Sequence, residues 1–429
     1  MTDLPMTPAT DPMEVTEDIG YQRAVEAVRS GVPNADAVRL LGCDQPAAEA
    51  RVHALVRELP DRAVRGEVSP GVLVAGDFGS GKSHLLEYLE QMALRDQFVV
   101  SRIAISKETP LYDLGKVFTA AIEHARAPGL SGHALEEVAL LLDPTTPAYS
   151  EFYQWVFSDE AGLSQMFPAT LMLHERLRTD QDLVEKIVGF WSGQKLGVSE
   201  VRAGLRQIGQ AQNFQLKQPR VAQLAVERFR FASRLFAAAG YGGWVLLIDE
   251  VELIGRYSLL QRGRSYAELA RWIAPSDTDG VPGILAVAAI TADFDVAVLQ
   301  ARNDRSLVPE RLSAKGTEEY FAMAERAVRG MDVIEREAMT LAPPDTTVLR
   351  RIYERLRETH GRAYGWTPPE IWQDGQPIRR GVRSHVRRWV TEWDLRRLYP
   401  ETAVELEEEE LRVDYEESAD LERVAEPED

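Results

Sequence analysis

The stretch Gly71-Val72-Leu73-Val74-Ala75-Gly76-Asp77-Phe78-Gly79-Ser80-Gly81-Lys82-Ser83 decides the fold of this chain. Its first residues form a short apolar run rich in β-branched side chains, which predicts a buried strand. A glycine-rich turn follows, and an amphipathic helix begins at its end. This order of strand, loop and helix is the context in which a G-x-x-x-x-G-K-[ST] spacing forms a phosphate-binding loop.

The residue types in this loop suit a nucleoside triphosphate. Glycine lets backbone N–H groups close around a phosphate without a Cβ in the way. Lys82 is expected to reach the β- and γ-phosphates, and the Ser83 hydroxyl to hold Mg²⁺. The predicted cofactors are therefore ATP and Mg²⁺. The residues expected to contact the nucleotide are Gly76, Asp77, Phe78, Gly79, Ser80, Gly81, Lys82, Ser83 and His84.

Two later apolar runs end in polar residues that suit the same chemistry. Residues 244–248 are apolar and are followed by Asp249 and Glu250. Asp249 is expected to enter the Mg²⁺ shell, and Glu250 to orient and polarise the attacking water. The run 283–290 ends at Thr291, which we expect to sense the γ-phosphate. A threonine there is equally consistent with a simple strand cap.

Arginines supply two further candidates. The interval 302–312 contains Arg311, our first choice for an arginine that enters a neighbouring subunit's site, and Arg305, our second. The alternative is a solvated or locally paired arginine. Arg383 lies on a helix predicted near the carboxyl end of the chain, and we expect it to report the nucleotide state. The other arginines of this helix are consistent with a solvated helical face.

The length and composition of the chain bear on the number of folded units, on membrane spans and on disulfides. The chain has 429 residues, 45% of them apolar, which suggests two or three folded units. No run approaches 18 apolar residues, so we expect no membrane span. Cys43 is the only cysteine, which excludes an internal disulfide and a cysteine-based metal cluster. We therefore expect a cytoplasmic location.

Charge and periodicity divide the chain. The net charge is −19, and the last 29 residues hold fourteen acids and two arginines. Residues 128–216 show no strong strand pattern and instead favour short helices, which we interpret as an insertion. The expected segments are a disordered N-terminus (1–18), an N-terminal helical element (19–62), a nucleotide-binding core (63–342, with the insertion at 128–216), a helical lid (343–400) and an acidic tail (401–429).

Together these elements resemble an AAA+-type ATPase. The resemblance implies an α/β, three-layer P-loop NTPase fold of the AAA+/ASCE type, with a parallel sheet, N-terminal helices, a helical insertion and a C-terminal helical lid. More narrowly, residues 76–89, 105–113 and 248–258 resemble a bacterial family that includes the ATP-binding D component of BREX (bacteriophage exclusion) defence systems. The similarity also takes in Gln261 to Tyr266 and Gly31-Val32-Pro33, so it covers most of residues 20–400.

The resemblance implies partners as well as activity. It implies a cytoplasmic ATPase acting beside a DNA methyltransferase, a phosphatase-like protein or a helicase-like protein. A different family is rejected: Leu130-Ser131-Gly132-His133 matches only the start of the Leu-Ser-Gly-Gly-Gln signature of transporter-type ATPases. His133 and Ala134 replace the residues that would contact a partner's γ-phosphate.

Three functions compete at this point. The first is an ATP-hydrolysing switch or motor subunit of a phage-defence assembly, with a homo-oligomer needed if Arg311 acts on a neighbour. The second is a nucleotide-gated scaffold with little hydrolysis. The third is an initiator-like DNA-binding ATPase, for which the arginine cluster at 379–388 is the local support. The acidic body of the chain disfavours strong phosphate-driven DNA binding.

Overall fold

The computed structural model describes residues 12–372 and 381–401. Their contacts divide the chain into two compact units. We call them the loop unit (residues 12–47, 76–91, 340–372 and 381–401) and the sheet unit (residues 48–75 and 92–339). The loop unit therefore contains the residues predicted to bind phosphate, and the sheet unit contains the two acidic candidates, Asp249 and Glu250.

The sheet is mostly parallel and mixed with many helices, as the sequence predicted. Its strands are β1 (Val72–Ala75), β2 (Val99–Ala104), β3 (Ala125–Arg126), β4 (Trp244–Asp249), β5 (Ile284–Ile290) and β6 (Met339–Thr340). They lie in the order β3-β2-β4-β5-β1-β6. The pairs β2–β4, β4–β5 and β1–β5 are parallel, and the short β3 runs antiparallel to β2. Every residue of β1, β4 and β5 is buried, which explains why these strands read as continuous apolar runs. This architecture is compatible with a P-loop NTPase-like fold.

The register places the candidate residues of the sheet unit at one edge. Ala75 pairs with Ile290, so β1 and β5 end level with one another. Ile248 pairs with Ala288, which brings Asp249 to the same edge. Because the three strands are parallel, Asp249 and Thr291 both lie at their carboxyl ends. The loop residue Gly76 follows Ala75 directly in the chain.

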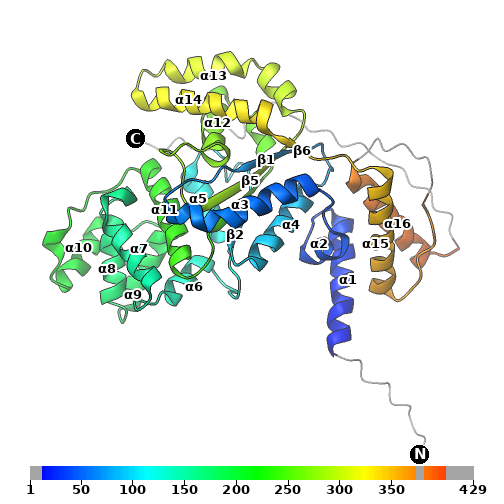
Figure 1. The fold of residues 1–429 in the computed structure, drawn as a ribbon, viewed down its shortest axis with the longest axis horizontal. Helices are drawn as coiled ribbons and strands as arrows, with labels where there is room; N and C mark the ends of the chain where they lie inside the picture. The colour runs from blue at the N-terminus through cyan, green and yellow to red at the C-terminus, as the bar shows by residue number, and fades with distance from the viewer. Residues whose placement is uncertain (1–11, 373–380, 402–429) are drawn as a thin grey trace, which may run out of the picture. The chain divides into compact units, whose positions relative to one another are not determined.

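Helices surround this sheet within the same unit (Figure 1). Those lying wholly or mainly in the sheet unit are α3 (Pro46–Val64), α5 (Leu114–Glu123), α6 (Ala134–Leu141), α7 (Pro147–Phe157), α8 (Met166–Arg176), α9 (Gln181–Trp191), α10 (Val198–Gln207), α11 (Val221–Ala238), α12 (Leu259–Ile273), α13 (Asp304–Ser313) and α14 (Glu318–Asp332). Short helical turns are η1 (Asp159–Ala161), η2 (Ala211–Asn213), η3 (Val251–Arg256), η4 (Asp295–Gln300) and η5 (Val333–Glu337). The helices α6 to α10 confirm the helical character predicted for residues 128–216.

Aromatic side chains join those helices to α11. Phe231 of α11 contacts Phe152, Phe167 and Trp191, with ring centroids between 5.0 and 5.4 Å apart. All four side chains are buried in the same core as the central strands. The segment 128–216 is therefore packed into the main core of the sheet unit.

A buried ion pair fixes the group of helices α12, α13 and α14. The guanidinium of Arg262 donates two hydrogen bonds of 2.8 Å to the carboxylate of Asp304, and the Tyr266 hydroxyl donates a third at 2.7 Å. Burial and the Asp304 charge raise the pKa of Tyr266 well above its usual value, so the phenol stays protonated and donating. Gly330 lets α14 approach α12, because a Cβ there would lie 1.9 Å from the Tyr266 carbonyl oxygen.

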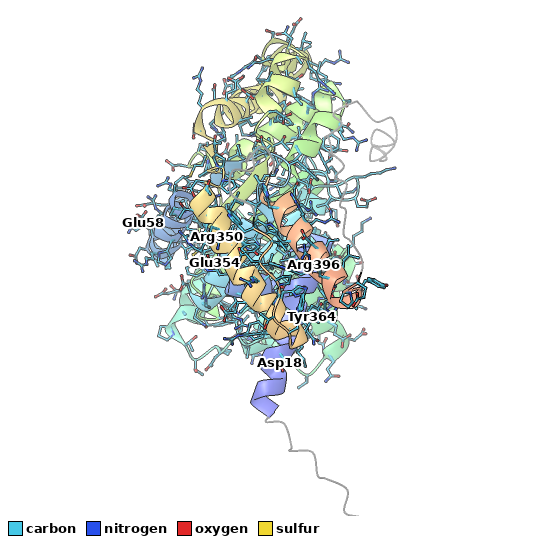
Figure 2. All side chains as sticks on the ribbon, turned by 90° about the vertical axis from the view of Figure 1, so that its right-hand side faces the viewer. Asp18, Glu58, Arg350, Glu354, Tyr364 and Arg396 are labelled. Carbon is cyan, nitrogen blue, oxygen red and sulfur yellow. The ribbon has the colours of Figure 1, made fainter. Side chains whose placement is uncertain are left out.

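The loop unit is built from α1 (Pro12–Ser30), α2 (Ala35–Leu41), most of α4 (Lys82–Arg95), α15 (Thr346–Tyr364) and α16 (Val382–Leu398). Val25 and Leu41 from the N-terminal helices share one core with Tyr353 of α15 and with Trp389 and Trp393 of α16. The N-terminal helices α1 and α2 therefore fold together with α15 and α16. On α15, Arg350 pairs with Glu354 one turn later, at 2.8 Å (Figure 2).

One expectation about the N-terminus was wrong in part. We expected residues 1–18 to be disordered, but α1 begins at Pro12. The fixed φ of proline suits the first position of a helix, so the backbone can become helical before the apolar pattern starts. Three expectations lie outside the described residues: the rest of that segment (1–11), the acidic tail beyond residue 401, and Arg379 and Arg380 of the arginine cluster.

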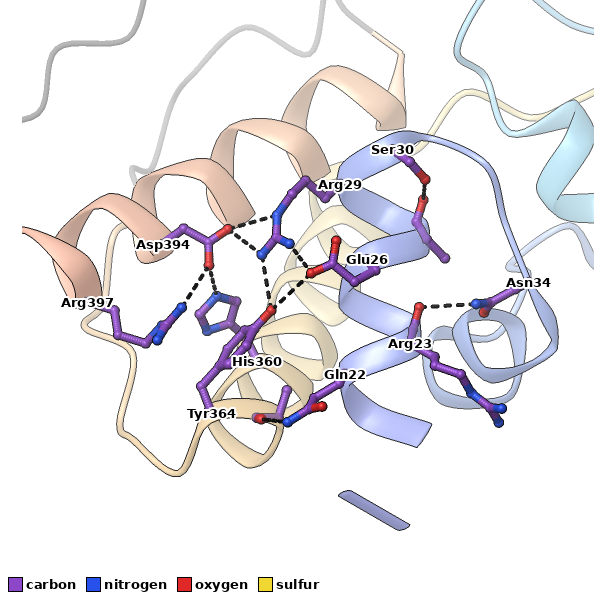
Figure 3. Close-up of polar contacts among 12 residues, drawn as sticks. Gln22, Arg23, Glu26, Arg29, Ser30, Asn34, His360, Tyr364, Asp394 and Arg397 are labelled. Carbon is purple, nitrogen blue, oxygen red and sulfur yellow. Dashed lines mark hydrogen bonds and ion pairs between the residues drawn. The ribbon is translucent and has the colours of Figure 1, made fainter. Parts of the chain in front are cut away.

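A polar network ties the first and last helices of the loop unit together (Figure 3). Asp394 of α16 accepts hydrogen bonds from Arg29 of α1 at 2.6 Å and from His360 of α15 at 3.1 Å. The indole N–H of Trp366 donates to Nδ1 of His360 at 3.0 Å, so the ring proton sits on Nε2 and faces Asp394. Burial alone would raise the pKa of Asp394, but the bonds from His360 and Arg29 lower it.

Within residues 12–372 and 381–401, no helix combines the length and the apolar character that a membrane crossing requires.

Candidate functional site

The loop between β1 and α4 contains the glycines that the sequence predicts to line a phosphate site. Gly79 and Gly81 have φ angles of +78° and +103°, a region that favours glycine. A Cβ on Gly81 would meet no atom within 4 Å, so the space above this residue is open. A Cβ on Gly76 would lie 2.4 Å from the Ser80 hydroxyl oxygen. The backbone of the loop therefore favours glycine at positions 79 and 81, and at position 76 a side chain would displace the Ser80 hydroxyl.

Lys82 begins α4 and turns back onto the loop. Its ammonium donates to the carbonyl oxygens of Gly76 at 2.8 Å and Asp77 at 3.4 Å, and its side chain is buried. Ser83 follows as the second residue of the helix. The positive end of the helix dipole and the Lys82 charge thus meet beside the loop, an arrangement that favours an anion.

Two donors near the loop have no hydrogen-bond partner. The Ser80 hydroxyl and Nε of Arg383 are both buried and unsatisfied. A buried donor without a partner costs free energy, on the order of 1–3 kcal/mol. A phosphate oxygen is a strong acceptor that could satisfy such donors.

Arg383 lies directly against the loop. Its backbone N–H donates to the Gly79 carbonyl at 3.2 Å, and its Nη2 donates to the Gly31 carbonyl at 2.9 Å. Its guanidinium carbon lies 5.7 Å from the centroid of the Phe78 ring. A Cβ on Gly381 would lie 2.6 Å from the Gly79 oxygen, so glycine before α16 permits this approach. The structure thus brings Arg383 to the predicted phosphate loop.

His84 has a structural contact. Its Nε2 lies 2.6 Å from the carbonyl oxygen of Gly42, so this nitrogen carries the proton and donates. Burial lowers the pKa of the imidazole, which keeps it neutral. The first turn of α4 is therefore anchored to the segment that follows α2.

In the sheet unit, Asp249 is buried and already engaged. Its Oδ1 accepts the backbone N–H of Glu250 at 3.0 Å, and its Oδ2 accepts from Nη2 of Arg102 at 3.3 Å. Glu250 is exposed and has a φ of +60°, an uncommon value for a residue with a Cβ. Strained backbone of this kind is often found at functional sites. Thr291 is buried at the end of β5.

Sequence reasoning did not single out Arg102 or Gly381. A signal for Arg102 was available, since it is the only charged residue in the run 98–105, which is apolar apart from Arg102 and Ser101. Gly381 carries no such signal, because its role depends on contact with Gly79, about 300 residues earlier.

The two arginines on α13 differ in their surroundings. Arg305 is half-buried and pairs with Asp332 at 2.8 Å and with Glu335 at 2.9 Å, which raises its pKa. It is therefore a locally paired arginine. Arg311 is exposed, and it forms no ion pair with any residue that the structure describes.

The residues expected to bind Mg²⁺ offer oxygen ligands and do not belong to a closed cluster of metal-ligating side chains. Among the described residues, no group of three or more His, Cys, Asp or Glu side chains could hold a metal ion. Mg²⁺ commonly takes only one or two protein ligands and completes its shell with water and phosphate oxygens. A hydroxyl from Ser83 and a carboxylate from Asp249 are donors of that kind.

Comparison with known proteins gives one match. Residues 32–139 match the family model described as BREX system ATP-binding protein BrxC/D. The matched segment contains the phosphate loop, α4 and β2, so the resemblance noted from the sequence is confirmed there. Neither the curated proteins nor the solved structures yielded a match.

Proposed function

We propose, from the match of residues 32–139 to ATP-binding proteins of BREX systems, that this chain binds ATP with Mg²⁺ and hydrolyses it. It would do so as the AAA+-type ATPase subunit of a bacterial phage-defence assembly, acting as a switch or motor. The proposed partners are other components of such a system: helicase-like, methyltransferase or phosphatase-like proteins. The proposed location is the cytoplasm.

The observation that carries the proposal is the pair of unsatisfied donors at the loop. Ser80 and Arg383 each present a buried N–H or O–H without an acceptor, beside a glycine with open space above it. The protein bears the cost of these donors in the unliganded state. Binding of a phosphate oxygen would remove that cost, so the loop is prepared for an anion.

The roles of the side chains follow from their chemistry. Lys82 would exchange its carbonyl partners for β- and γ-phosphate oxygens, and the N-terminal amides of α4 would face the same charge. Glu250 would hold the attacking water, and Thr291 would donate its hydroxyl toward the γ-phosphate. Ser83 and Asp249 would be the residues that supply oxygen ligands to Mg²⁺, and the bound ion would neutralise charge on the phosphate oxygens. Arg383 would connect the occupied loop to α16.

One observation favours the second candidate, a nucleotide-gated scaffold with little hydrolysis. Arg102 already occupies Oδ2 of Asp249, the oxygen that would enter the metal shell. Turnover in the isolated chain would then be slow until a partner or a neighbouring Arg311 favours the active arrangement. The two candidates differ in rate and share the same nucleotide site.

Phosphate release from purified protein with Mg-ATP tests the proposal. Lys82→Ala should weaken binding and abolish turnover, whereas Glu250→Gln should abolish turnover and retain binding. Arg387→Ala is a matched control, because Arg387 is exposed one turn beyond Arg383 on the same helix. Turnover no faster in the wild type than in Glu250→Gln, with tight ATP binding in both, would support the scaffold. An absence of ATP binding in the wild type would contradict both candidates.

A further inference from the structure

The sheet unit contains a polar pocket of about 380 Å³ that no step above uses. Its walls come from the end of α3, from α7 and η1, from α11, and from the segment that leads into β5. Three arginines line it: Arg65, Arg230 and Arg234. The volume falls within the range of small-molecule sites, roughly 300–1,000 Å³.

Arg230 and Arg234 lie one turn apart on α11 and lack ion-pair partners. Both are half-buried, and neither makes an ion pair or a hydrogen bond with any described residue. Nearby Arg228 differs, since it donates to the carbonyls of Phe190 and Gln194. Gly162 leaves room for Arg230, because a Cβ there would lie 2.8 Å from its Nη1.

The surroundings do not compensate these two charges. Burial lowers the pKa of Arg230, and Arg271 lowers it further against a smaller opposing effect of Glu227. Burial likewise lowers the pKa of Arg234, and the negative charge of Glu151 offsets part of this decrease. The guanidinium of Arg234 lies 5.3 Å from the centroid of the Trp155 ring, a contact that supplies no counter-charge. Two desolvated cations at (i, i+4) also destabilise the helix that carries them.

Acidic side chains line the pocket without neutralising this pair. Asp277 and Glu160 are exposed, and neither pairs with Arg230 or Arg234. Arg65 is exposed and hydrogen-bonds to Glu67 at 2.6 Å. The pocket therefore combines unpaired cations on α11 with carboxylates that can accept hydrogen bonds from hydroxyl groups.

The pocket is separate from the edge that carries Asp249 and Thr291. Pro282 lines it and precedes β5, whereas Thr291 follows β5. Gly66 also lines it and precedes β1. The pocket thus borders the amino ends of the parallel strands. At about 3.3 Å per residue, β5 separates the two edges by about 20 Å.

We propose that this pocket is a second anion site, which binds a small phosphorylated molecule of nucleotide size through Arg230 and Arg234. The planar guanidinium fork suits phosphate oxygens, and the carboxylate of Asp277 can accept a ribose hydroxyl. The small volume of the pocket and the aromatic wall at Trp155 favour a single nucleotide over an extended strand. A bound phosphate group would supply the negative charge that Arg230 and Arg234 lack in the unliganded fold.

Calorimetric titration of the full chain with AMP and with inorganic pyrophosphate tests this site. Arg230→Gln/Arg234→Gln should weaken binding of these probes by about tenfold or more, since two charge-assisted contacts are lost. Arg206→Gln on α10 is the control for net charge, because Arg206 is exposed and remote in sequence from the pocket lining. Lys82→Ala should retain binding, which separates this site from the phosphate loop and keeps the test independent of the proposed function.

Two further measurements keep the result interpretable. Asp277→Asn removes a negative charge from the lining and should tighten pyrophosphate binding a few-fold, and its exposed position spares the fold. The thermal midpoint of unliganded Arg230→Gln/Arg234→Gln should be no lower than that of the wild type. Two arginines that stabilise the fold would lower this midpoint when they are replaced, whereas two arginines without a counter-charge would not.

Several outcomes would overturn the proposal. The proposal is wrong if the wild type and Arg230→Gln/Arg234→Gln bind AMP and pyrophosphate with equal affinity. It is also wrong if Lys82→Ala abolishes binding of both probes. Binding of a single-stranded oligonucleotide with no binding of AMP or pyrophosphate would also reject a small-molecule site.

Discussion

The guanidinium of Arg383 lies over the ring of Phe78, 5.7 Å from its centroid, while its Nη2 holds the carbonyl of Gly31 at 2.9 Å. One side chain of α16 thus contacts the phosphate loop and the turn after α1. Both contacts join segments that are far apart in the sequence, and the Nε of Arg383 lacks a partner. We propose that an anion accepting a hydrogen bond from this nitrogen would shift α16 against the loop, which would make Arg383 a reporter of the bound nucleotide.

Arg383→Ala should therefore weaken the response to nucleotide more than it weakens the fold. We expect ATP affinity or turnover to fall by about tenfold or more, from the loss of one charge-assisted contact. Measurements of Kd for a slowly hydrolysed analogue and of phosphate release would show this. Arg387→Ala should match the wild type. Equal losses in both variants would mean that Arg383 has no specific role.

Gly381→Ala tests the approach of α16 to the loop without removing a charge. A Cβ at this position would meet the backbone oxygen of Gly79 at 2.6 Å, so the start of α16 must shift. We expect weaker ATP binding with the helical content unchanged, measured by titration and circular dichroism. Gly115→Ala in α5 is the control, since its closest contact is the Asp113 side chain at 3.3 Å. Unaltered binding in Gly381→Ala would show that the close approach is dispensable.

Local patterns were enough to predict the central strands and the helices of the loop unit. Buried parallel strands are apolar throughout, so 72–75, 244–248 and 284–290 could be recognised without a partner strand. On α16, the apolar residues recur at helical spacing, and Val386, Trp389, Val390 and Trp393 are all in the core.

Contacts between distant segments could not be predicted in this way. The association of Val25 with Tyr353 and Trp393 depends on packing across more than 300 residues. The pairing of Arg102 with Asp249 depends on strand register. From the sequence alone, Arg230 and Arg234 are consistent with the charged face of an ordinary helix. Only the structure shows which arginines have partners. Sequence motifs indicate which residues we expect to have chemical roles, whereas the partners of those residues depend on tertiary structure.

The pairing of Arg102 with Asp249 leads to a prediction about magnesium. Arg102→Gln removes a cation from a buried carboxylate, and this should destabilise the unliganded protein by about 1–3 kcal/mol. If Asp249 binds Mg²⁺, Mg-ATP should restore much of that loss, because the metal supplies a new counter-charge. Thermal unfolding with Mg-ATP and with ATP plus a chelator would compare the two states. Equal stabilisation under both conditions would argue against a metal at Asp249.

His174 should make the sheet unit sensitive to mild acid. Burial, and secondarily the charge of Arg178, lower the pKa of this imidazole to about 4. Since the unfolded value is about 6.5, the unfolded chain binds the proton first, and stability falls as pH drops from 6.5 toward 4. His174→Met should reduce the loss between pH 7.5 and 5.5 by about 1 kcal/mol, measured by urea unfolding. Parallel pH profiles for variant and wild type would exclude this residue as a cause.

The contrast between Arg305 and Arg311 predicts different effects for two neighbouring substitutions on α13. Arg305→Ala removes ion pairs to Asp332 and Glu335, so it should lower the thermal midpoint. Arg311→Ala removes an exposed side chain and should leave that midpoint unchanged. If Arg311 acts on a neighbour's nucleotide, its loss should reduce turnover by about 10³-fold or more, the scale typical of arginine fingers.

Mixing experiments distinguish action on a neighbour from action within one chain. In an oligomer formed with a slowly hydrolysed analogue, Arg311→Ala chains mixed with Glu250→Gln chains should recover activity, because each contributes the group that the other lacks. A monomeric chain gives no recovery. Full turnover by Arg311→Ala alone, at concentrations where the wild type assembles, would remove Arg311 from the catalytic residues. The hydrolytic groups would then lie entirely within one subunit.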